Sequence, residues 1–136
     1  MKNLRTILVS SLLAALVIIS VGCSFSVGTA NLSSLKTSLD KEGTKPSTTF
    51  KDGETAYAVA TVSNNIGKVK VKTYLTSNNE TLKGSEVTID LDGDGTSSYH
   101  FTVGEGLPAG SYNIVSDMIN ENGEKKDSNT VAIKVE

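Results

Sequence analysis

The 136-residue chain contains one cysteine, one histidine and no tryptophan. With a single cysteine it cannot form an internal disulfide, so packing alone must stabilise the folded state. The histidine, His100, stands between Tyr99 and Phe101 and has no second His or Cys at a zinc-ligand spacing. We therefore expect His100 to be an exposed strand residue rather than a metal ligand or a catalytic base.

Catalytic motifs and a basic patch are also missing. The sequence has no Gly-x-Ser-x-Gly motif, P-loop or zinc-binding spacing, which predicts a protein that is not an enzyme. Lys2 and Arg5 are two of its 13 basic residues, so the chain after residue 22 carries 11 basic and 15 acidic side chains, a net charge of −4. Nucleic-acid-binding domains usually concentrate positive charge on one face, and we expect no nucleic acid among the partners.

The one continuous apolar run lies near the N-terminus. A short basic start, residues 1–5, precedes the apolar residues 7–19, which is the pattern of a secretory signal. An uncleaved membrane helix fits less well, because serines interrupt the run and it is shorter than the ~20 residues that a bilayer requires.

The cysteine stands directly after this run, in Ser20-Val21-Gly22-Cys23. The segment resembles the lipobox of bacterial lipoproteins, with Gly22 fitting the position before the cysteine and Ser20 replacing the usual Leu, Val or Ile. The resemblance implies that residues 1–22 are removed and that Cys23 carries the lipid, detectable by palmitate labelling. It also implies an exported protein anchored to the cell membrane or outer membrane, facing the periplasm or the exterior. The alternative is cleavage after Ala30, which would release a soluble secreted protein.

The rest of the chain is long enough for one small domain. Residues 23–31 are small and polar, which suits a flexible tether, and residues 32–136 show short alternating runs separated by turn residues. We expect a first strand from Leu32 and further strands at residues 49–50, 55–62, 68–75, 81–83, 86–91, 99–103, 112–119 and 131–135. About seven strands with turn signals roughly every 8–12 residues predict an all-β antiparallel sandwich.

A tyrosine near one strand start adds a more specific signal. The segment Leu107-Pro108-Ala109-Gly110-Ser111-Tyr112 resembles the corner of immunoglobulin-like and fibronectin-like domains, where a tyrosine hydroxyl bonds to upstream backbone. The pattern of residues 50–135 is similar to bacterial immunoglobulin-like surface domains. The resemblance implies an immunoglobulin-like β-sandwich in which Tyr112 is structural, without the Cys-Trp-Cys core of antibody domains.

One acidic segment could bind an ion. Asp90, Asp92 and Asp94, followed by Gly95, resemble the first half of an EF-hand or dockerin calcium loop. The twelfth position from Asp90 is Phe101 rather than a bidentate glutamate, and the flanking residues alternate as strands do. We therefore interpret residues 92–95 as an acidic hairpin tip and expect no metal or cofactor, with Ca²⁺ at the three aspartates as the alternative.

The remaining charges are interpreted as surface features. Lys68, Lys70 and Lys72 form an outward ridge on one strand, where lysines discourage edge-to-edge pairing. Residues 125–127 are likewise interpreted as surface charge.

Two functions remain open. The first is a non-enzymatic, lipid-anchored domain that binds or spaces an envelope protein through the loops at residues 64–67, 92–95 and 123–126. The second is a carbohydrate-binding module on the same scaffold, for which Tyr74 is the outward aromatic that could stack on a sugar. A subunit completed by a partner's strand fits less well, because residues 131–135 supply a last strand of the chain's own.

Overall fold

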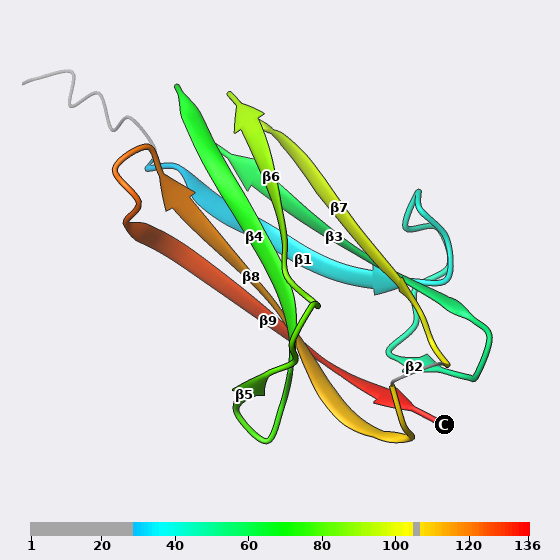
Figure 1. Ribbon diagram of the computed structural model, residues 1–136. Coiled ribbons are helices and arrows are strands. Elements are labelled where there is room, and N and C mark those ends of the chain that lie inside the picture. The colour runs from blue at the N-terminus through cyan, green and yellow to red at the C-terminus, as the bar shows by residue number, and fades with distance from the viewer. Residues whose placement is uncertain (1–28, 105–106) are drawn as a thin grey trace, which may run out of the picture.

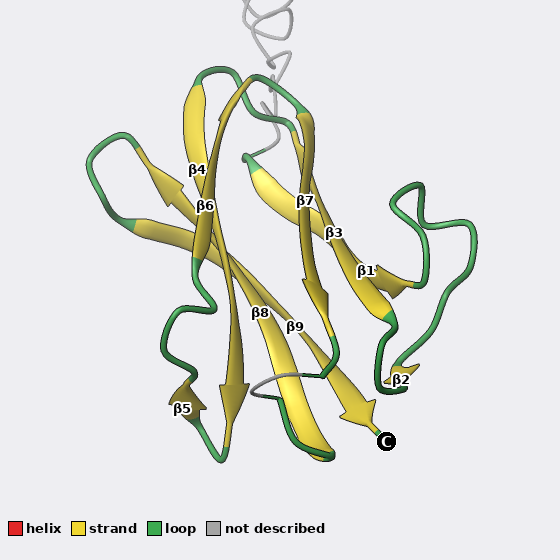
Figure 2. Ribbon diagram, turned by 45° about the vertical axis from the view of Figure 1, so that its right-hand side comes forward, coloured by secondary structure: helices red, strands yellow, loops and turns green. Residues whose placement is uncertain are grey.

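The computed structural model describes residues 29–104 and 107–136, which form two β-sheets packed face to face (Figures 1 and 2). The predicted signal segment, Cys23 and most of the predicted tether lie outside the described residues. The described part contains no helix that is long and apolar enough to cross a membrane. Its strands are β1 (Asn31–Ser38), β2 (Thr49–Phe50), β3 (Thr55–Ser63), β4 (Lys68–Ser77), β5 (Glu80–Thr81), β6 (Val87–Asp92), β7 (Gly95–Thr102), β8 (Gly110–Asn120) and β9 (Lys125–Val135).

The smaller sheet has the order β1-β3-β7, and the larger has the order β2-β9-β8-β4-β5, with β6 also paired to β4. All these pairs are antiparallel except β2 with β9, which is parallel. Consecutive strands repeatedly change sheets, as in immunoglobulin-like domains. The fold is an immunoglobulin-like β-sandwich, and the predicted fold class is confirmed.

Alternation along the strands produces the core. The inward face of β4 buries Val69, Val71, Thr73 and Leu75, as their spacing predicts. The inward side chains form two clusters, one that includes Phe50 and Ile114 and one that includes Val71 and Met118. In β3 the inward face is the small one, made of Ala56, Ala58, Ala60 and Val62. These small side chains leave room for the larger Ile114 and Met118, which lie in the same two clusters.

The predicted hairpin at residues 92–95 is wrong. Strand β6 pairs with β4 in the larger sheet, whereas β7 pairs with β3 in the smaller one. Gly93, with a φ of 81°, forms a tight turn as the glycine predicts, but the turn carries the chain from one sheet to the other. The turn is local, whereas the pairing partner of each strand is set by contacts distant in sequence.

The edge-protection role proposed for the lysine ridge is also wrong. Lys68, Lys70 and Lys72 do point outward, but β4 has β8 on one side and β6 on the other, so it is not an edge strand. On this side of β4 the edge strand is β6, where Val87 is 43% exposed although it shares a face with the inward residues Ile89 and Leu91.

Two polar side chains of β9 close one open side of the sandwich. The Asp127 carboxylate accepts the N–H of Leu32 at 2.8 Å, and the Asn129 amide donates to the carbonyl of Leu32, also at 2.8 Å. The interpretation of Asp127 as surface charge is therefore wrong, because its carboxylate binds the backbone of β1. These bonds fix the strand that leads in from the N-terminal segment.

The tyrosine corner is present in the structure. The hydroxyl of Tyr112, a residue only 7% exposed, donates to the carbonyl of Pro108 at 2.6 Å. The bond ties the start of β8 to the connection that precedes it, as the resemblance implied.

We expect Tyr112→Phe to lower the free energy of unfolding by about 1 kcal/mol, because the Pro108 carbonyl loses a part-buried donor. Urea denaturation measures the change. Tyr57→Phe is the matched control, since Tyr57 lies on the outer face of β3. Equal stability of Tyr112→Phe and the wild type would contradict a stabilising role for the corner.

Candidate functional site

The three loops predicted as a contact surface gather at one end of the sandwich, where β1 begins (Figure 1). They connect β3 to β4, β6 to β7 and β8 to β9. A groove of about 430 Å³ at this end is lined by residues of the first and third loops and by Thr29 and Ala30. We call this region the loop end.

Asn65 joins the first two loops. Its side-chain amide donates to the carbonyl oxygens of Gly67 at 2.7 Å and Gly93 at 2.9 Å. Its backbone N–H donates to the Asp94 carboxylate at 2.7 Å, and the N–H of Gly93 donates to the carbonyl of Gly67 at 3.0 Å. These bonds join the connection between β6 and β7 to the β3–β4 loop.

The joined loops leave one apolar side chain in water. Ile66, between Asn65 and Gly67, is 85% exposed. Both of its neighbours are fixed by hydrogen bonds, so the loop holds Ile66 outward.

The β8–β9 turn is organised by Asn120. Its side-chain oxygen accepts the backbone N–H of Asn122 at 3.0 Å and of Glu124 at 2.9 Å. The Lys126 ammonium, 2.6 Å from the Glu124 carboxylate, is the main cause of the lowered pKa of Glu124. The predicted Asn-Gly turn is present, with Gly123 at a φ of 81°.

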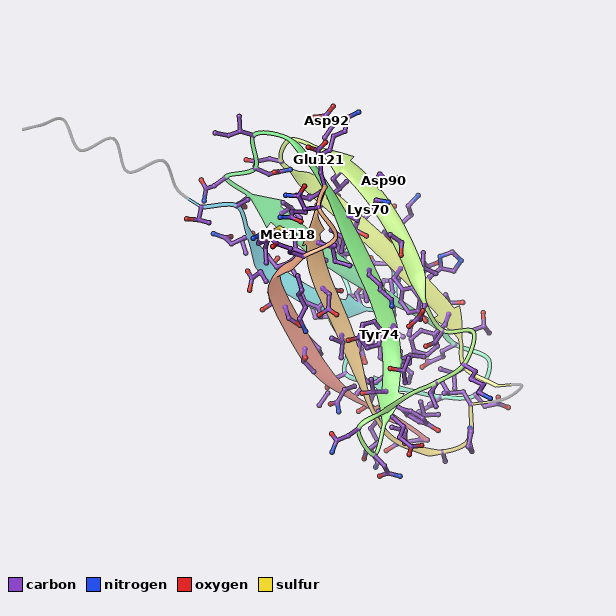
Figure 3. The ribbon with its side chains drawn as sticks, turned by 60° about the vertical axis from the view of Figure 1, so that its left-hand side comes forward. Lys70, Tyr74, Asp90, Asp92, Met118 and Glu121 are labelled. Carbon is purple, nitrogen blue, oxygen red and sulfur yellow. The ribbon has the colours of Figure 1, made fainter. Side chains whose placement is uncertain are left out.

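The outer face of the larger sheet carries charges of alternating sign, which Figure 3 shows around Lys70, Asp90 and Asp92. Lys68 stands opposite Asp92 and Lys70 opposite Asp90 on neighbouring strands. The ammonium of Lys72 lies 2.9 Å from the carboxylate of Glu86. The predicted basic ridge is thus interleaved with acids and is not a positively charged surface.

The structure does not bring Asp90, Asp92 and Asp94 together as metal ligands. Asp90 and Asp92 face lysines on β4, whereas Asp94 accepts the N–H of Asn65. Residues 29–104 and 107–136 contain no cluster of three or more His, Cys, Asp or Glu side chains that could hold an ion.

Sequence reasoning missed Asp117, which is only 8% exposed although it lies on the outer face of β8. Its carboxylate accepts the hydroxyls of Tyr74 at 3.0 Å and Ser128 at 2.6 Å, and the Lys125 ammonium lies 3.8 Å away. Burial, followed by the bond to Asp117, raises the pKa of Tyr74. The three polar neighbours of Asp117 come from the two strands that flank it, β4 and β9, and no local sequence pattern predicts them.

Tyr74 is not an open platform for a sugar. Its hydroxyl is bound to Asp117, and the ammonium of Lys72 lies 5.6 Å from the centre of its ring. A second outward aromatic, Tyr57, was missed and lies with its ring centre 5.8 Å from that of His100. His100 is exposed on β7, where its alternation with Tyr99 and Phe101 placed it.

No protein-family model and no curated protein matches this sequence. Similar solved structures include a Niemann-Pick type C2 protein from the Japanese carpenter ant, at 19% identity and a TM-score of 0.49, covering 80% of this chain and 94% of that one. A family 76 glycoside hydrolase from a bovine Bacteroides thetaiotaomicron strain has 13% identity and a TM-score of 0.50, covering 76% of this chain and 20% of that one.

The CARDB domain of a Pyrococcus furiosus protein has 15% identity and a TM-score of 0.45, covering 85% of this chain and all of that one. At such identities a structural match concerns the fold and carries no activity over to this chain.

We expect Asn65→Ala to lower the free energy of unfolding by about 1–2 kcal/mol, because the part-buried Gly93 carbonyl loses its donor and the Gly67 carbonyl keeps only the N–H of Gly93. Urea denaturation measures the loss. Ile66→Ala, one residue away, is the control and should leave stability nearly unchanged, since its side chain is in water. A stable Asn65→Ala variant would show that the two loops are held by other contacts.

We expect millimolar Ca²⁺ to leave the melting temperature unchanged. A ligand that binds only the native state must raise its stability, but the three aspartates face lysines or a backbone N–H rather than a common point. Calorimetry with Ca²⁺ and with EDTA tests this. A rise in melting temperature that disappears in Asp94→Asn would contradict it.

Proposed function

We propose that this protein is an exported lipoprotein, anchored through Cys23, whose immunoglobulin-like domain is a non-catalytic module at the cell envelope. In this role it binds or spaces another envelope component. Residues 1–22 have the composition of a secretory signal and end at a small residue before the cysteine.

The packing of Ala30 is the observation that most favours cleavage before Cys23. Ala30 lies against the core cluster that contains Leu32 and Met118, and the amide of Asn31 donates to the carbonyl of Thr29 at 3.2 Å. Cleavage after Ala30 would remove residues that already belong to the packed domain. Cleavage before Cys23 leaves all of them in place, with five residues, 24–28, as the connection.

The protein–protein role is preferred to the carbohydrate-binding one. Tyr74, the residue on which sugar binding depended, has its hydroxyl occupied and a lysine over its ring. Exposed aromatic faces are what such modules offer to a sugar.

We expect the intact mass of protein purified from cells expressing the whole sequence to equal residues 23–136 plus acyl chains, with palmitate incorporated. A thiol is required for acylation, so Cys23→Ser should lose the label and the added mass. Unmodified, water-soluble material beginning at Asn31 would contradict the proposal.

A further inference from the structure

Ile66 combines unusual exposure with a fixed position. At 85% it is far more exposed than the other large apolar residues on the described surface, Val87 at 43% and Leu39 at 40%. Single exposed apolar residues are ordinary, so exposure alone does not indicate a ligand. The hydrogen bonds of Asn65 and Gly67, on both sides of Ile66, fix the loop backbone and so hold the side chain outward.

The position of the predicted anchor gives the second observation. Thr29 and Ala30 line the same groove as Asn65 and Gly67, the two neighbours of Ile66. Cys23 lies six residues before Thr29, and six residues span at most about 20 Å when fully extended. A lipid on Cys23 therefore keeps Thr29 within about 20 Å of a membrane surface, and Thr29 lines the same groove as the two neighbours of Ile66.

The charges around Ile66 bear on which lipids the loop end can approach. Two of its acids have partners within the domain, Asp94 at the N–H of Asn65 and Glu124 with Lys126. Asp92 stands opposite Lys68 in the strand register. Glu121 also lies at this end, beside Lys68 in a groove on β4 and β6. The four acids outnumber the two lysines, so attraction to anionic headgroups is not the driving force. The driving force is instead the burial of the apolar Ile66 side chain.

We propose that the loop end docks on the lipid bilayer and that Ile66 enters the bilayer interface as a second contact beside the lipid on Cys23. This rests on the proposed lipid anchor. In this orientation the three loops face the membrane. They are therefore not the surface that contacts an envelope partner, which is the role that the sequence predicted for them. The opposite end, with β2 and β5, then points away from the membrane, and the residue 39–48 connection stands out from the side of the sandwich (Figure 2).

The absence of tryptophan from the sequence makes the test direct. We would place a single tryptophan at the loop end with Ile66→Trp and directly after the far end of β1 with Leu39→Trp. The full-length gene is expressed, and the membrane-extracted protein is reconstituted into zwitterionic vesicles with and without brominated lipids. We expect emission from position 66 to shift to shorter wavelength and to be quenched, while emission from position 39 stays that of exposed tryptophan.

Quenching at neither position, or equally at both, would overturn the docking. If quenching at position 66 required anionic lipid, the assignment of Ile66 burial as the driving force of docking would be overturned. Ile66→Ser supplies a second readout: its spontaneous transfer between vesicles should be about tenfold faster than that of the wild type, because burying such a side chain contributes about that factor. Leu39→Ser is the matched control and should transfer like the wild type.

The anchor and the docking can be separated. If native protein proves unmodified, residues 23–136 of each tryptophan variant are produced without the signal segment, the Cys23 thiol, the only one in the chain, is coupled to a maleimide lipid, and the fluorescence is measured again. Quenching at position 66 would then support the docking although the natural anchor had failed. An acylated native protein without quenching would leave the anchor standing and refute the docking.

Discussion

The hydrogen bonds from two β9 side chains to the main chain of Leu32 determine where the N-terminal segment meets the domain. In a chain without an internal disulfide, the first strand is held by its pairing with β3 and by the side chains of Asp127 and Asn129 across the open side of the sandwich. Both the N–H and the carbonyl of Leu32 are bound. Thr29 and Ala30 are thereby placed at the loop end, and the orientation proposed for the domain on a membrane follows from that placement.

Most of the strands could be predicted because period-two alternation is a local property. The face of each strand could not always be assigned. In β3, hydrophobicity alone would bury Tyr57 and Val59, yet the alanine face is inward because β8 fills the space opposite with larger side chains. The hairpin prediction at residues 92–95 and the edge role of Lys70 failed for a related reason. The pairing partner of each strand is set by contacts between segments distant in sequence, so the residues of a turn do not predict it.

The candidate site was predictable only in outline. Turn residues correctly placed three loops, and a sandwich of this kind brings such loops to its ends. The importance of Ile66 could not be recognised from its place in Asn64-Asn65-Ile66-Gly67, because its exposure depends on bonds that Asn65 makes to residues 28 and 29 positions away. Asp117 was overlooked and Asp127 was misinterpreted for the same reason, since their partners lie on other strands.

The parallel pairing of β2 with β9 has a mechanical consequence. The N–H groups of Lys134 and Glu136 donate to the carbonyls of Thr48 and Phe50 at 2.8 and 2.9 Å. The first and last described residues lie at opposite ends of the sandwich (Figure 1). Tension between them would load this ladder in shear, so its bonds would have to rupture together rather than unzip singly. A domain tethered at one end and pulled at the other would resist extension at this patch.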